Sequence, residues 1–213
     1  MRTLGYSLIA VLLYGTVMTP VVAHAEPELD ALEGPDAQRR CEAVSKLAQS
    51  GLSSSDATNR LLRLAAAGEE GSNLIMRNSS RWYAIVLIGK LKIKEAIPWL
   101  IENIELHDPA YSTAGQSQET LTFDYYLPCV QALLGFRESA IEEVSKAALD
   151  SDDEIRTTLL TSTLRRFHQP QMVRDTLARI TARQTTRHDQ SFIEEKINAI
   201  PELPLPSVRD RHS

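Results

Sequence analysis

Two stretches of the sequence share one pattern: AIVLIGKLKIKEAIPWLIENIE at residues 84–105 and CVQALLGFRESAIEEVSKAALD at residues 129–150. Each starts as an apolar helical segment that runs into a glycine, Gly89 or Gly135, and then into a short polar turn. An Ala-Ile pair and a second helical segment follow in both. The glycines are 46 positions apart (135 − 89), within the period of about 40–47 residues of two-helix repeats. We expect each glycine to end its helix and allow the left-handed turn that reverses the chain.

Helix-sized amphipathic blocks, separated by short polar breaks, continue this pattern along most of the chain. No alternating β-strand pattern competes with them outside the first 25 residues, and Pro128 is expected to delay or kink its helix. A longer polar break covers residues 107–122. The predicted fold is therefore all-α, an α-solenoid of about four antiparallel helical hairpins over residues 37–200. The helices are expected at about 37–50, 53–68, 82–91, 95–106, 123–136, 138–149, 153–167, 171–183 and 190–200.

The repeated unit resembles the HEAT-repeat family, especially its bilin-lyase-like branch. That family has an apolar helix, Leu-Gly, a polar turn, Ala-Val/Ile-Pro and a second apolar helix. Residues 82–106 and 129–156 fit this pattern, although Glu142 stands where the first copy has Pro98. Residues 37–68 match by periodicity alone. The resemblance implies a HEAT-like superhelix that acts as a protein-binding scaffold, with a lyase-type enzyme as the alternative.

The first 25 residues have the features of a secretory signal peptide. Arg2 precedes a largely apolar run, and the segment ends in the Ala-x-Ala pattern formed by Ala23 and Ala25. Cleavage there predicts an exported protein, periplasmic or extracellular, with no membrane span afterwards; retention of the segment as an anchor stays open. We expect an acidic linker at residues 26–36 and a Pro-rich, disordered tail at residues 201–213.

The chain has a net charge of −5 and two cysteines, Cys41 and Cys129. An acidic chain lacks the basic footprint of nucleic-acid binding, so no nucleic-acid partner is expected. The two cysteines fall on the first helices of repeats one and three, on the order of 20 Å apart if helices stack at 8–10 Å. A disulfide needs Cα atoms within about 7 Å. We therefore predict no disulfide and expect both thiols to be small buried groups.

No catalytic motif stands out in the sequence. The histidines have no partner at metal-ligand spacing, and the sequence lacks HExxH, CxxC, phosphate-loop and GxSxG motifs. We therefore predict no enzyme activity, no metal and no cofactor. The leading hypothesis is a protein–protein interaction module whose partner is another protein. Two alternatives stay open: a lyase-type enzyme, which export disfavours, and a structural subunit of an envelope assembly.

Two groups of residues are candidate binding sites. Trp99 falls away from the apolar face of its predicted helix, beside Glu95 and Glu102, where it could anchor a partner. The alternative is that the Trp99 side chain packs under the polar segment at 107–122. The second group, Arg179 and Arg183, belongs to a segment at 155–189 with seven arginines and two aspartates. Such a basic end could bind an acidic partner, although a solvated helix face is the favoured explanation.

Three aromatic residues lie at the start of the helix expected at 123–136. Such residues more often cover the core under a long loop than form a binding patch. The three are Phe123, Tyr125 and Tyr126. The apolar run at 82–88, by contrast, predicts a helix buried on both sides.

Overall fold

The computed structural model describes residues 26–52, 54–68, 72–109 and 127–200, and this part of the chain is all-α. It contains ten α-helices, one short 3₁₀ helix (η1) and no strand. The predicted signal peptide, the aromatic residues at 123–126 and the tail lie outside the described residues. The helices are α1 (Glu26–Glu33), α2 (Ala37–Ser50), α3 (Ser55–Ala66), α4 (Ser80–Leu91), η1 (Lys94–Ala96), α5 (Ile97–Glu102), α7 (Pro128–Phe136), α8 (Glu138–Asp150), α9 (Glu154–Arg166), α10 (Pro170–Thr181) and α11 (Gln190–Ala199).

Short polar side chains fix where half of these helices begin. Each accepts a hydrogen bond from a backbone N–H group of the first turn, which satisfies a donor that has no partner within the helix. The helices α7 and α10 instead begin at a proline, whose missing N–H costs nothing there. The capping residues are Asp36, Ser54, Ser79, Asp153 and Asp189.

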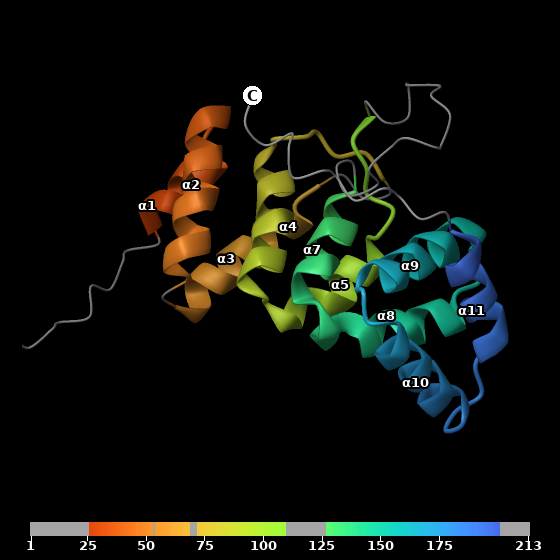
Figure 1. Ribbon diagram of the computed structural model, residues 1–213. Coiled ribbons are helices and arrows are strands. Elements are labelled where there is room, and N and C mark those ends of the chain that lie inside the picture. Colours follow the sequence, from red (N-terminus) through yellow and green to blue (C-terminus); the bar gives the residue numbers. More distant parts are fainter. Residues whose placement is uncertain (1–25, 53, 69–71, 110–126, 201–213) are drawn as a thin grey trace, which may run out of the picture.

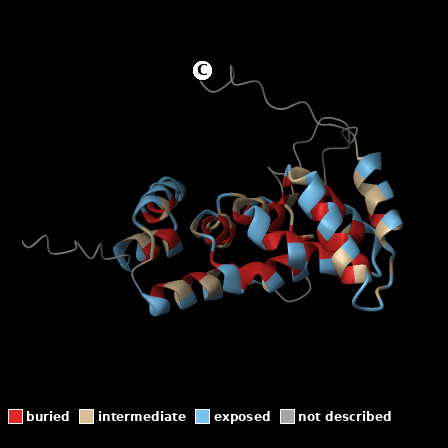
Figure 2. Cartoon of the chain, turned by 60° about the horizontal axis from the view of Figure 1, so that its bottom comes forward, coloured by how far each residue is buried: buried red, intermediate tan, exposed pale blue. Residues whose placement is uncertain are grey.

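The helices lie in two rows. In the first row α2, α4, α7, α9 and α11 each contact the next, and in the second row α5 contacts α8 and α8 contacts α10. Contacts of α3 with α4, α5 with α7 and α8 with α9 join the rows. Figure 1 shows α1 and α2 at one end of the molecule and α11 at the other. Buried residues face the space between the helices, and exposed residues cover the outward faces (Figure 2).

The helix α4 of the first row is buried on both sides, as its apolar sequence predicts. Trp82, Ile85 and Ile88 are among its buried residues, and α4 packs between α2 and α7. The block expected at 95–106 is shorter than predicted: η1 covers its first turn and α5 ends at Glu102. After α5, the backbone of His107 forms an isolated parallel bridge with Leu74.

The segment expected to be an acidic linker is instead the helix α1, so that prediction is wrong. Leu29 and Leu32 are fully buried against the neighbouring helices, which include α2 and α3. The guanidinium of Arg60 on α3 donates to the carboxylates of three residues of this segment: Glu26, Asp30 and Glu33. Two buried leucines and a shared arginine hold these residues in place, although their composition is that of a linker.

Gly89 and Gly135 lie close together where α4 packs against α7, and the role predicted for them is wrong. A Cβ atom on Gly89 would lie 2.5 Å from the Cα of Ala132 on α7. The residues with positive φ that follow the two helices are Lys92, with φ 55°, and Arg137, with φ 53°. The glycines therefore permit a backbone-to-backbone approach of two helices, and the turns are made by the residues that follow.

The two cysteines differ in exposure. Cys129, on α7, is fully buried as predicted, and burial raises the pKa of its thiol. Cys41 is exposed on α2, so the prediction that it packs in the core is wrong. It falls beside the buried positions Ala43, Val44 and Leu47, on the polar side of an amphipathic helix.

None of the described helices is long and apolar enough to cross a membrane.

Candidate interaction surface

Both groups of predicted binding residues lie in the second row of helices. Glu95 is in η1, Trp99 and Glu102 are in α5, and Arg179 is in α10, with Arg183 just beyond its end. The helix α8 contacts both α5 and α10, so it lies between the two groups. We call the outward faces of η1, α5, α8 and α10 the second-row surface.

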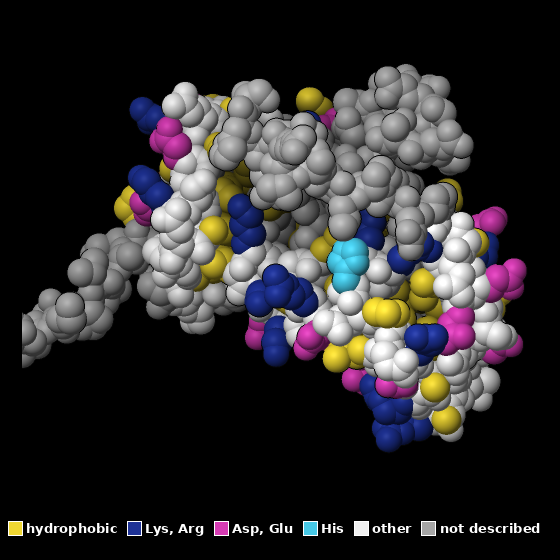
Figure 3. All heavy atoms as spheres, viewed as in Figure 1, with side chains coloured by type: hydrophobic (Ala, Val, Ile, Leu, Met, Phe, Trp, Pro, Cys, Tyr) yellow, Lys and Arg dark blue, Asp and Glu magenta, His cyan; other side chains and the backbone are white. Residues whose placement is uncertain are grey.

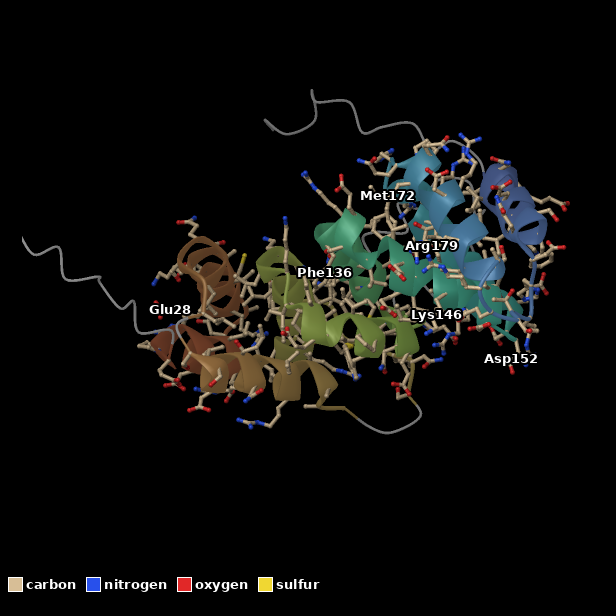
Figure 4. All side chains as sticks on the ribbon, turned by 90° about the horizontal axis from the view of Figure 1, so that it is seen from below. Glu28, Phe136, Lys146, Asp152, Met172 and Arg179 are labelled. Carbon is tan, nitrogen blue, oxygen red and sulfur yellow. The ribbon has the colours of Figure 1, made fainter. Side chains whose placement is uncertain are left out.

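The centre of this surface is an ion pair between α8 and α10. Arg179 Nη1 lies 3.1 Å from Glu142 Oε1, and Arg179 Nη2 lies 3.1 Å from Glu142 Oε2. Each terminal nitrogen of the guanidinium therefore contacts one oxygen of the same carboxylate. This bidentate geometry is the one by which arginine recognises a carboxylate most specifically. Figure 4 views the molecule from below and shows Arg179 on α10 near Lys146 on α8.

Both signs of charge occur on the helices around this ion pair: Lys146 and Arg183 are accompanied by the exposed acids Glu138, Glu143 and Asp175. The hydrogen bond from Arg179 lowers the pKa of Glu142 most, the charge of Arg179 adds to it, and the charges of Arg183 and Lys146 lower it further. One carboxylate thus lies among three cations. Arg183 and Lys146 are exposed, so this end of the surface can accept a further anionic group from a partner.

The α5 end of the surface has the opposite charge and a partly covered aromatic ring. Glu95 and Glu102 are exposed. Trp99 is half-buried and packs against the hydrophobic core, while its carbonyl accepts hydrogen bonds from the backbone and side-chain amides of Asn103. A partner would therefore meet two carboxylates and only part of the indole ring.

Two residues of this surface were not predicted: Glu142 and Lys146. Glu142 replaces Pro98 of the other repeat copy, and that departure was its only sequence signal. A proline there could not hold Arg179, because the ion pair needs a carboxylate that reaches across from α8 to α10. Lys146 follows Glu142 by four residues, so both occupy one face of α8.

No group of three or more His, Cys, Asp or Glu side chains within the described ranges could hold a metal ion.

A shallow, open depression is lined by residues 181–189, the loop between α10 and α11. His188 fixes this loop: its backbone N–H donates to Leu149 O, its Nε2 lies 2.9 Å from Ser151 O, and its ring stacks on Phe192.

Comparison with protein-family models, with curated proteins and with solved structures finds no match to this chain.

Proposed function

We propose that this protein is an exported α-solenoid of HEAT type that binds another protein through its second-row surface and has no catalytic activity. The observation that carries the proposal is the Glu142–Arg179 ion pair between α8 and α10, with exposed cations beside it. The pair lies on two neighbouring helices rather than on loops.

The contacts between helices support the solenoid part of the proposal. In a helical-repeat array each hairpin buries its apolar face only by stacking on its neighbours. Here α4, α7 and α9 contact one another in sequence, and so do α5, α8 and α10. Such stacking creates a long surface from one equivalent helix of each hairpin, which suits the recognition of an extended or flat partner.

The charges of the surface indicate the kind of partner. Lys146 and Arg183 call for acidic groups at the α8–α10 end, while Glu95 and Glu102 call for basic groups at the α5 end. A partner with the reverse arrangement would be held in one orientation. Because these side chains are exposed, they contribute more to the rate and orientation of association than to affinity.

Site-specific photo-crosslinking tests the proposal. A photoreactive amino acid is placed at Glu102 or Arg183, and as a control at Lys46 on α2 at the other end of the molecule. Each variant is irradiated in the native envelope fraction, and the adducts are identified by mass spectrometry. We expect the same protein adduct from positions 102 and 183 and none from position 46. Equal adducts from all three positions, or none from any, would remove the second-row surface as the binding site.

Export is tested separately. The intact mass of the protein recovered from cells is expected to match residues 26–213, cleaved after Ala25. A recovered mass that includes residues 1–25 would favour the membrane-anchor alternative. Spectroscopy of the same sample tests the lyase alternative, because a covalent chromophore adds both mass and visible absorbance.

A further inference from the structure

The loop between α10 and α11 is fixed at both of its ends. We call residues 182–189 the α10–α11 loop; it projects below the two helices in Figure 1. At its start, the backbone N–H groups of Arg183 and Gln184 donate to Ile180 O. At its end, His188 is bound to two carbonyls at the C-terminal end of α8 and stacks on a ring of α11. The residues between these two anchors are therefore held in place although they belong to no helix.

Three successive backbone N–H groups between the anchors have no acceptor in the part of the chain that the structure describes. They belong to Thr185, Thr186 and Arg187, which all line the depression on this loop. The hydroxyl of Thr186 donates to His188 O, so it adds a contact that holds the loop. Successive free N–H groups in a turn are a feature by which proteins bind anions. The loop thus presents a row of donors whose positions are set before a ligand arrives.

Two arginines of the same loop add positive charge to these donors. Arg183 is exposed and forms no ion pair with any residue that the structure describes. Arg187 Nη1 lies 3.7 Å from Asp152 Oδ2, which is longer than a hydrogen bond. Figure 3 shows Lys and Arg side chains at the lower edge of the molecule, over α10. The N–H groups of both guanidinium groups are therefore available to a ligand.

The acidic side chains beside these donors are Asp152 and Asp189. The Oδ1 atom of Asp189 accepts hydrogen bonds from Ser191 Oγ and from the N–H of Phe192, so this carboxylate is occupied at the N-terminus of α11. Asp152 makes only the long contact with Arg187, which an anion of higher charge would replace. A phosphate group has a charge of about −1.5 to −2 at pH 7 and three acceptor oxygens, so it satisfies more of these donors than a carboxylate does.

We propose that the α10–α11 loop binds a phosphate group, with the N–H groups of residues 185–187 and the guanidinium groups of Arg183 and Arg187 as donors. Arg183 also belongs to the second-row surface. The proposal therefore deepens the function proposed above, on which it rests for the partner: it names the anionic group that this end of the surface accepts. Free phosphate and a phosphorylated residue of a partner present the same oxygens to the loop, and the experiment distinguishes these two sources.

The test is an NMR titration of the backbone amides of the full chain. Inorganic phosphate and a phosphoserine residue flanked by glycines are the two ligands, and sodium chloride at matched ionic strength is the control. We expect both ligands to shift the amide resonances of residues 185–187 until they saturate. Tighter binding of the phosphopeptide assigns the site to a phosphorylated partner, and tighter binding of inorganic phosphate assigns it to the free ion. Equal shifts with chloride would reflect general screening of charge and overturn the proposal.

The double variant Arg183→Gln/Arg187→Gln shows whether the arginines of the loop are responsible. Both side chains are exposed, so we expect an unchanged thermal unfolding midpoint and an affinity for phosphate about tenfold lower, as for the loss of two exposed charge contacts. The control Arg39→Gln/Arg174→Gln removes the same charge at exposed positions of α2 and α10 and should keep the affinity within about twofold. An unchanged affinity in the loop variant overturns the proposal.

Failure of this proposal and failure of the proposed function give different results. A loop that binds phosphate, in a protein that gives no crosslinked partner from positions 102 and 183, would contradict the second-row surface and support the phosphate site. Crosslinks to a partner from those positions, with no phosphate-dependent shift at residues 185–187, would contradict the phosphate site alone.

Discussion

A Cβ atom added to Gly135 would lie 2.6 Å from the carbonyl oxygen of Gly89, so the backbones of α7 and α4 touch at these two residues. Contacts this short involve backbone atoms, which cannot move aside as a flexible side chain can. The packing of the two central helices of the first row therefore requires glycine at both positions.

Alanine at Gly89 or Gly135 is expected to destabilise the fold. Overpacking typically costs about 1–3 kcal/mol, and a clash with backbone should lie at the upper end, above the gain of up to about 1 kcal/mol from the better helix propensity of alanine. Urea unfolding followed by circular dichroism measures the change. The matched control is Gly34→Ala, whose Cβ would meet only ordinary contacts of 3.4 Å or more and should change stability by less than about 0.5 kcal/mol. Equal effects at positions 34 and 135 would contradict the close approach.

Glycine at Arg137 is expected to stabilise the protein. The substitution relieves a backbone conformation that costs on the order of 1–3 kcal/mol for an L-residue, although part of the gain is lost to the greater freedom of glycine in the unfolded chain. We expect a net gain of about 1 kcal/mol in the same urea assay. Arg137→Ala removes the charge and keeps the strain, so it should give no gain. Stabilisation by alanine as large as that by glycine would show that the charge, not the backbone, is responsible.

Removal of the Arg60 guanidinium should loosen α1. The hydrogen bond from Arg60 lowers the pKa of Glu33. This hydrogen bond therefore stabilises the folded protein fully above the usual glutamate pKa of about 4.3, and the stabilisation is lost as the pH falls through the lowered pKa of Glu33. We expect Arg60→Ala to cost about 1 kcal/mol at pH 7, and less at pH 3. Urea unfolding at both pH values tests this. Arg174→Ala, exposed on α10, is the control. A cost of Arg60→Ala that did not depend on pH would exclude the ion pairs as its cause.

The Glu142 carboxyl should titrate differently when Arg179 is absent. Because Arg179 lowers the pKa of Glu142, Arg179→Ala is expected to raise that pKa towards the usual value. A carbon-detected NMR titration of the glutamate side chains would follow it. Arg174→Ala on the same helix serves as the control and should leave Glu142 unchanged. An unaltered Glu142 in the Arg179 variant would mean that the pair does not persist in solution.

The two thiols should react at different rates. Cys41 is exposed and Cys129 is buried, with a raised thiol pKa, and the thiolate is the reactive form. Ellman's reagent is expected to modify one thiol of the native protein quickly and the second only after unfolding. Cys41→Ser should abolish the fast phase and Cys129→Ser should keep it. Two fast phases in the native protein would contradict the burial of Cys129.

Helix positions could be predicted from the sequence because they depend on local patterns. The Asp36 cap and the apolar period after it place α2 at the predicted residues, and Pro128 begins α7. The contact between Gly89 and Gly135 could not be predicted, since it depends on which helix packs on which. Export, the HEAT-type repeat and a protein partner stay predictions.

The charged sites were harder to predict than the helices. The Arg-rich composition of residues 155–189 pointed to Arg179, but the partner Glu142 is 37 residues earlier on another helix, and only packing brings the two together. The linker prediction for residues 26–36 was wrong because composition ignores spacing: Leu29 and Leu32 are three residues apart, which suffices to bury one face of a short helix.

The position of α1 has a consequence for assembly. In a stack of hairpins each unit leaves an apolar face for the next, and the stack stops only where a helix with a polar outer face covers the end. Here α1 covers α2 and α3 with two leucines and presents acidic side chains outward. Its leucines thus cover apolar surface of α2 and α3, and we expect a chain that lacks α1 to expose that surface and to associate with further copies of itself.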